Sequence, residues 1–196
     1  MVALTGASGA VYGVRLIEEL LKRGDDVDLV ISPSGFLILK EELGFSRPGK
    51  DIAKALMEFF KFNRSGKARL HYHENADISS RLSSGSSLKR AMVVCPCSMG
   101  TLARISSGIS GNLIERAADC VLKESGLLVL VPRETPLNAI HLENMLKLKN
   151  AGAVMLPAMP GFYFKPETIE DMVDFMVGKI LDSLGIENIL YRRWKG

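Results

Sequence analysis

Residues 2–21 read VALTGASGAVYGVRLIEELL, and this stretch changes character twice along its length. It opens with the short apolar run Val2–Leu4, passes through a turn of small residues, Thr5–Gly9, and ends in a pattern with an apolar residue at every third or fourth position. Glu18 lies four residues before Lys22 on the polar side of that pattern, a spacing that supports an ion pair on a helix. The order of strand, tight turn and helix indicates the start of a βαβ unit.

Similar apolar runs follow along the chain, separated by helical patterns. Most of these runs are continuously apolar, as expected for parallel strands that helices cover on both faces. They are Val27–Ile31, Ala91–Val94, Leu127–Val131 and Ala153–Leu156. A further strand is expected at Arg69–Tyr72, and helices are expected over Asp51–Phe60 and Ile169–Leu184, the last with Pro166 in its first turn. The sequence therefore predicts one α/β domain over residues 1–196, a flavodoxin-like (Rossmann-like) doubly wound parallel sheet.

The overall composition is ordinary for a globular protein and argues against several classes of function. The chain has 25 basic and 22 acidic side chains, and the net charge of +3 is too small and too dispersed for a nucleic-acid surface. No apolar run reaches the roughly 18 residues of a membrane span, and no basic leader opens the chain, so a cytoplasmic location is expected. The three histidines lack partners at zinc-ligand spacing, so no metal is expected. Cys95, Cys97 and Cys120 are too few for a disulfide framework and are expected to be reduced and mostly buried.

Turns made of small residues follow two of the predicted strands. In open α/β sheets the ligand binds outside the carboxyl ends of the strands, where glycines let the backbone approach it and helix N-termini offer free N–H groups. Thr5–Gly9 has this composition but is neither a G-x-G-x-x-G fingerprint nor a P-loop, and a turn without any ligand would also explain it. Cys95–Thr101 is a second such turn, and Ser32–Pro33 supplies a helix cap after another strand. Two turns of this kind favour a nucleotide-like ligand.

Charged residues near the ends of the predicted strands and helices indicate that this ligand carries phosphate. The segment Pro132–Pro136 holds Arg133 between two prolines at the sheet edge, where an arginine can meet a phosphate in forked geometry. Arg116 and Lys123 lie seven residues apart on a predicted helix and so share one face, although a solvated helix face would have the same spacing. The residues alone thus predict an α/β domain that binds a phosphorylated, nucleotide-like ligand.

Longer motifs in this chain resemble those of the UbiX-type flavin prenyltransferase family. The most specific motif begins at Pro132 with PRETPL and continues with IHLENM from Ile140. The other motifs are Thr5–Gly13, Cys95–Leu102, Asn112–Asp119, Gly161–Tyr163 and Asp171–Leu184, so the resemblance covers nearly the whole chain. It implies a metal-independent transfer of a dimethylallyl group from dimethylallyl phosphate to N5 and C6 of reduced FMN. The product would be the prenylated FMN cofactor that UbiD-type decarboxylases use.

The resemblance also implies three groups of site residues. FMN is expected to contact Gly6, Ala7, Ser8, Ser32, Ser98, Met99, Gly100, Thr101 and Arg133. The substrate phosphate is expected to meet Ser84, Gly85, Arg116, Lys123, Tyr163 and Lys179. The expected acid–base residues are Ser8, Glu42 and Glu134, although by position alone Glu42 is an ordinary solvated carboxylate. Lys179 departs from the family, which usually has arginine there, and a lysine cannot make the same forked contact with phosphate.

The family resemblance further implies a homo-oligomer, a dodecamer, with sites shared between subunits. Two alternatives stay open. The first is a flavin-dependent cysteinyl decarboxylase on the same fold, but that group relies on a catalytic histidine and a substrate-clamping motif that this sequence lacks. The second is a flavin-binding assembly subunit of a hydroxyarylic acid decarboxylase without turnover of its own. A scaffold would have no need for the second phosphate set of Arg116, Lys123 and Tyr163, which argues against it.

Overall fold

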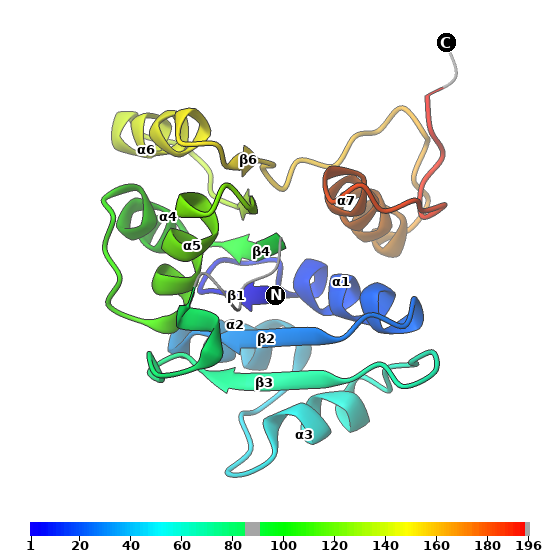
Figure 1. The fold of residues 1–196 in the computed structure, drawn as a ribbon. Coiled ribbons are helices and arrows are strands. Elements are labelled where there is room, and N and C mark those ends of the chain that lie inside the picture. The colour runs from blue at the N-terminus through cyan, green and yellow to red at the C-terminus, as the bar shows by residue number, and fades with distance from the viewer. Residues whose placement is uncertain (85–90, 195–196) are drawn as a thin grey trace.

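The computed structural model describes residues 1–84 and 91–194, and its centre is a six-stranded parallel sheet (Figure 1). The strands are β1 (Val2–Leu4), β2 (Val27–Ile31), β3 (Leu70–Glu74), β4 (Ala91–Cys97), β5 (Leu127–Pro132) and β6 (Val154–Met155). They lie in the order β3-β2-β1-β4-β5-β6, and every pair of neighbours is parallel. This is the Rossmann order of a doubly wound sheet, so the predicted fold class is confirmed. The order reverses between β1 and β4, which places the expected ligand crevice there.

β4 runs three residues further than the sequence predicts. Pro96 has no N–H to donate to a ladder, and for that reason a strand is not expected to continue through it. In the structure the register between β4 and β5 shifts between Val94 and Cys97, and pairing resumes with Cys97 opposite Pro132. The extension carries the turn after β4 out to the carboxyl edge of the sheet.

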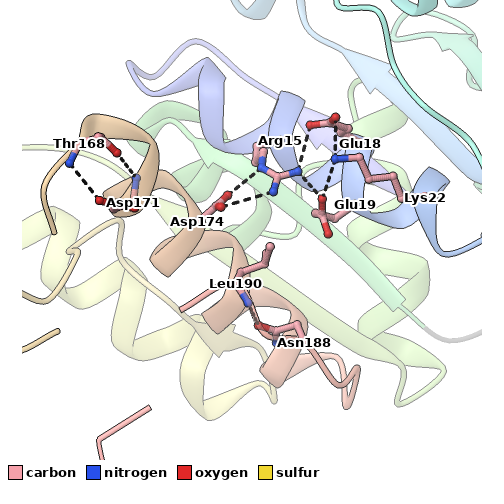
Figure 2. A network of polar contacts seen from close by, with 9 residues as sticks. All are labelled: Arg15, Glu18, Glu19, Lys22, Thr168, Asp171, Asp174, Asn188 and Leu190. Carbon is pink, nitrogen blue, oxygen red and sulfur yellow. Dashed lines mark hydrogen bonds and ion pairs between the residues drawn. The ribbon is translucent and has the colours of Figure 1, made fainter. Parts of the chain in front are cut away.

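Seven helices connect and cover these strands within the described part of the chain. They are α1 (Ala10–Lys22), α2 (Pro33–Leu43), α3 (Ile52–Phe59), α4 (Met99–Ser106), α5 (Leu113–Lys123), α6 (Ala139–Asn150) and α7 (Ile169–Ser183), with a short 3-10 helix, η1 (Arg81–Ser83), before β4. The expected first-turn role of Pro166 is wrong. α7 begins after Thr168, whose hydroxyl accepts from Asp171 N while the Asp171 carboxylate accepts from Thr168 N (Figure 2). This capping box satisfies N–H groups at the start of the helix without a proline.

The helices bury two separate apolar clusters on the two faces of the sheet. One cluster contains Leu29 and Ile31 of β2 together with α1, α2, α3 and α7, whereas Val30 points to the other cluster with α4, α5 and α6. Figure 1 accordingly shows α7 beside α1, with α4, α5 and α6 gathered away from them. α5 and α7, which both carry predicted phosphate-binding residues, therefore lie on opposite faces of the sheet.

A network of ion pairs fastens α7 to α1 (Figure 2). Arg15 Nε lies 2.7 Å from Asp174 Oδ1 of α7, and the same guanidinium also contacts Glu18 (3.0 Å) and Glu19. Lys22 Nζ lies 2.8 Å from Glu18 Oε1, so the expected pair on the outer side of α1 is confirmed. Because these side chains are only partly exposed, the network orients the two helices more firmly than isolated surface pairs would.

The three cysteines are buried and unpaired, as the sequence predicts. Burial raises the pKa of Cys97 to about 12. Over residues 1–84 and 91–194 the structure contains no group of three or more His, Cys, Asp or Glu side chains placed to hold a metal ion. No helix in the same ranges is long and apolar enough to cross a membrane.

Candidate active site

Thr5 joins the two small-residue turns at the point where the strand order reverses. Its hydroxyl donates to the Pro96 carbonyl at 2.8 Å and accepts from the Ser98 backbone N–H at 2.8 Å. Only 1% of its surface is exposed, so these bonds lie in a dry environment where they are costly to lose. From the sequence, Thr5 was predicted only as part of a turn. The signal that could have singled it out is a hydroxyl directly after a fully apolar strand.

Two capped helices begin at the same edge. The Ser98 side chain accepts from Thr101 N (3.2 Å) and donates to Thr101 Oγ1 (3.0 Å), while the Ser32 side chain accepts from Gly35 N (2.9 Å). The N-termini of α4 and α2 thus point their partial positive charge toward the crevice, the arrangement that suits an anionic group. The structure therefore brings Ser32 and the Ser98–Thr101 turn together beside the loop after β1.

Glycines allow α2 to approach this loop closely and α1 to approach β4. A Cβ on Gly6 would lie 2.4 Å from Ser34 Cβ, and a Cβ on Gly13 would lie 2.3 Å from the Cys95 carbonyl oxygen. No larger side chain fits at either position without movement of the backbone around it. The Gly6–Ser8 segment is thereby held in contact with the start of α2.

Glu42 completes the N-terminus of α1. Gly9 precedes this helix and has no side chain to cap it, and the Glu42 carboxylate instead accepts from Gly9 N (2.9 and 3.1 Å) and Ala10 N (2.9 Å). Because Glu42 lies in the last turn of α2, both ends of that helix contact the β1–α1 loop. Glu42 is exposed, but it is not the free surface carboxylate that its position in the sequence suggests.

Arg133 reaches the same loop from β5. Its Nε donates to the Ser8 carbonyl at 3.3 Å, and the side chain is half-buried. Beside it lies a cavity of about 270 Å³, which Glu134, Met145 and Met159 also line. Glu134 is exposed there, with its Oε1 accepting from Thr135 N at 3.0 Å.

Tyr12 of α1 is a further residue of this region, and it was not among the predicted site residues. Burial raises the pKa of its hydroxyl, the nearby Cys95 acts in the same direction, and the charges of Arg133 and Glu42 act on it with opposite signs. Its ring also packs against Gly9, since a Cβ built on Gly9 would lie only 2.8 Å from Tyr12 Cδ2. Tyr12 is therefore close enough to both the predicted base and the predicted phosphate-binding arginine for their charges to act on its hydroxyl.

A second cavity of about 580 Å³ separates the segment after β6 from α7. Lys179 lines it, and Pro157 and Met159 line both this cavity and the one beside Arg133. Tyr163 lies close by, because its ring contacts that of Phe175 of α7 with 5.9 Å between ring centroids. The structure thus places Lys179 and Tyr163 on the side of the crevice that β6 and α7 form.

Three other predicted phosphate-binding residues, Arg116, Lys123 and Ser84, lie on or next to α5, away from Lys179 and Tyr163. Arg116 and Lys123 lie on the outer face of α5, where they pair with Asp119 (2.7 Å) and Glu124 (3.8 Å). Ser84 follows η1, which a Cys120 Sγ–Ser83 O hydrogen bond of 3.1 Å ties to α5. Gly85 lies outside the described residues. A single chain therefore does not gather the predicted phosphate set, since α5 and α7 cover opposite faces of the sheet.

The fold and the crevice define a nucleotide-binding α/β protein, and the family model described as Flavoprotein matches residues 1–181. The chain is 50% identical over 193 residues, 98% of its length and 91% of the relative's, to the flavin prenyltransferase UbiX of Halalkalibacterium halodurans. The chain therefore belongs to the UbiX family of flavin prenyltransferases.

Two solved structures extend the similarity to the whole fold. A crystal structure of AnUbiX in complex with FMN and dimethylallyl pyrophosphate has a TM-score of 0.88 and 39% identity, with 100% of this chain and 96% of that chain covered. A dodecameric FMN-dependent UbiX-like decarboxylase from Escherichia coli O157:H7 has a TM-score of 0.87 and 42% identity, with 100% and 98% covered. Similarity over such lengths confirms the predicted family and fold.

Proposed function

We propose that this chain transfers the dimethylallyl group of dimethylallyl phosphate to N5 and C6 of reduced FMN and releases a prenylated FMN. The observation that carries the proposal is the crevice between β1 and β4. There Thr5 joins two small-residue turns, the N-termini of α2 and α4 are presented, and Arg133 meets the Ser8 loop. Membership of the prenyltransferase family supports the reaction assigned to this crevice.

The residues of the crevice fit FMN. Its phosphate suits the helix N-termini and the Arg133 guanidinium, and its ring system suits the apolar side chains of Met145 and Met159 in the cavity beside Arg133. We assign to it the residues that the family resemblance implies, which are Gly6, Ala7, Ser8, Ser32, Ser98, Met99, Gly100, Thr101 and Arg133. When bound in its reduced form, the flavin supplies the nucleophilic atoms of the transfer.

The chain's own residues then position the donor and move protons. Glu42 lies at the Ser8 loop and acts as the base of the ring-closing step, with Ser8 beside it and Glu134 near the departing phosphate. Fixed cations and hydroxyls stabilise the charge that grows on the leaving phosphate. The cations are those of Arg116, Lys123 and Lys179 and the hydroxyls those of Ser84 and Tyr163, with Gly85 expected to contribute through its backbone only and without the help of a metal.

The separation of α5 from α7 supports an active site that is shared between subunits. Arg116 and Lys123 can meet the phosphate held by Lys179 if α5 of one subunit packs near α7 of another. Large apolar side chains that are more than half exposed in the single chain offer contact surface for such packing. They are Ile140, Leu142 and Leu146 of α6, together with Met159 and Phe162. We therefore propose a homo-oligomer, a dodecamer, which works in the cytoplasm as a single-domain enzyme and passes its product to a UbiD-type decarboxylase.

Mass spectrometry of the released flavin tests this function directly. The protein is incubated anaerobically with reduced FMN and dimethylallyl phosphate, and the flavin is extracted. We expect a mass gain of one dimethylallyl unit. Unmodified FMN, with flavin binding confirmed by fluorescence, would contradict the transferase and favour the decarboxylase or assembly-subunit alternative.

A further inference from the structure

The C-terminal segment after α7 folds back and packs against that helix. Tyr191 is 8% exposed and its ring stacks edge-on against Phe175 with 5.0 Å between centroids. Gly178 makes this contact possible, because a Cβ there would lie 2.4 Å from Tyr191 Cδ1. Asn188 secures the turn by donating to the Gly178 carbonyl at 3.2 Å and accepting from Leu190 N at 3.3 Å, and Figure 2 shows this pair beside α7.

Asp182 is the polar centre of this contact. Its carboxylate accepts from the Tyr191 hydroxyl at 2.6 Å and from Asn188 Nδ2 at 2.9 Å. Arg193 donates to both of its oxygens, from Nη2 to Oδ1 at 2.7 Å and from Nη1 to Oδ2 at 3.1 Å. Burial alone would raise the pKa of Asp182, but the hydrogen bonds from Arg193 and Tyr191 outweigh it and hold that pKa below its usual range. The carboxylate is therefore charged, and a forked guanidinium compensates that charge.

Lys179 lies one helical turn before Asp182 and lines the same cavity. Its Nζ lies 5.0 Å from the centroid of the Tyr191 ring and 5.7 Å from that of Phe175, within the range of cation–π attraction. Within the described ranges no carboxylate pairs with Lys179, so its charge is available to a ligand. A dianionic phosphate in this cavity would meet the Lys179 cation and the Asp182 carboxylate together.

We propose that Arg193 and Tyr191 are positioning residues for the phosphate subsite. Arg193 cancels the repulsion that Asp182 would exert on the phosphate, and the Tyr191 ring holds the Lys179 ammonium toward the cavity. The inference rests on the proposed function, in which Lys179 binds the phosphate of the donor. It also bears on Lys179, which stands where the family usually has arginine. An ammonium group cannot make the bidentate contact of a guanidinium, so its position relative to the phosphate depends more on the residues around it.

Calorimetric titration of the FMN-loaded, oxidised protein with dimethylallyl phosphate tests this, since no transfer takes place in that state. Arg193→Gln should weaken the affinity about five- to tenfold, because the Asp182 carboxylate is then left uncompensated beside the bound phosphate. The double variant, in which Asp182→Asn is added to Arg193→Gln, should bind dimethylallyl phosphate with an affinity within about twofold of wild type. Arg192→Gln is the matched control and should leave the affinity unchanged. With reduced FMN, Arg193→Gln should raise KM for the donor by the same factor and leave kcat unchanged.

The outcomes separate the inference from the proposed function. Wild-type affinity in Arg193→Gln, or a double variant as weak as Arg193→Gln alone, would overturn the inference while the transferase stands. A C-terminal segment with a purely structural role predicts the second of these results, because Asp182→Asn removes further hydrogen bonds. Failure of the wild type itself to bind dimethylallyl phosphate, or an unchanged affinity in Lys179→Ala, would overturn the proposed phosphate site.

Discussion

The Thr5 hydroxyl accepts a 2.8 Å hydrogen bond from the backbone N–H of Ser98, and these two residues come from turns 93 positions apart in the sequence. The same hydroxyl donates to the Pro96 carbonyl at 2.8 Å. This buried side chain, together with the Thr5 N–H that also donates to the Pro96 carbonyl at 3.2 Å, fixes the spacing of the two turns on which the flavin site depends. No other side chain of the described residues hydrogen-bonds to both turns.

Replacing this hydroxyl by a methyl group should therefore loosen the crevice. Thr5→Val keeps the shape of the side chain but leaves the Ser98 N–H without a partner and removes one of the two hydrogen bonds to the Pro96 carbonyl, which still accepts from the Thr5 N–H. The expected cost is about 2 kcal/mol in the free energy of unfolding. FMN affinity should fall as well. Urea denaturation and flavin fluorescence measure the two effects. Thr5→Ser keeps the hydroxyl and should lose only about 1 kcal/mol, and equal losses in both variants would contradict this role.

Gly13 sets the distance between α1 and β4. Gly13→Ala should destabilise the protein by about 3 kcal/mol, because the new Cβ would meet the Cys95 carbonyl oxygen, a backbone atom that cannot move aside. Gly49→Ala is the control, since a Cβ there has nothing within 4 Å. Thermal unfolding of both variants measures the difference. If Gly13→Ala unfolds at the same midpoint temperature as the wild type, α1 and β4 are not in close contact.

Glu42→Gln should separate the structural role of this residue from its chemical role. The amide oxygen of glutamine still accepts a hydrogen bond at the start of α1, so the protein should fold and bind FMN. It cannot take up a proton, and single-turnover formation of the prenylated flavin should slow about a hundredfold. Glu41→Gln changes an exposed neighbour on the same helix and should leave the rate unchanged. An unchanged rate in Glu42→Gln would remove this residue from the mechanism.

Stability in acid, below pH ~4, should depend on Asp28 of β2. Its Oδ1 lies 2.7 Å from His73 Nε2 and 2.5 Å from Arg81 Nη2. Burial acts to raise the pKa of Asp28, but the hydrogen bond from His73 and the charge of Arg81 outweigh it and lower that pKa. A depressed carboxyl pKa gives stability that is fully present above the unfolded value, about 3.9, and is lost as the pH falls through the folded value.

Asp28→Asn should accordingly reduce the free energy of unfolding by about 1–2 kcal/mol at pH 7 and make its decline below pH ~4 shallower. Denaturant titrations from pH 7 to pH 3 measure both effects. Asp26→Asn, at an exposed position two residues earlier, should keep the wild-type slope. If Asp28→Asn declines as steeply as the wild type, another carboxylate governs the acid transition.

The sequence alone determined the elements and the type of site. Continuous apolar runs such as Val27–Ile31 and small-residue turns such as Thr5–Gly9 are local patterns, because a strand needs apolar side chains on both faces and a ligand-approaching turn needs glycine. The motif around Arg133 determined the family in the same local way. The predicted start of α7 was wrong. Pro166 suggested a first helical turn, but the capping box of Thr168 and Asp171 starts the helix after Thr168.

Tertiary structure decided which of these residues meet. The order of strands put the turns after β1 and β4 together, and the orientation of α2 brought Glu42 back to α1, a contact across 33 residues that no local pattern encodes. It also put Arg116 and Lys179 on opposite faces of the sheet, because each helix follows the handed crossover of its own strand. The sequence determined which groups can bind a flavin and a phosphate, and the packing of helices on the two faces decided which of them a single chain can bring to one ligand.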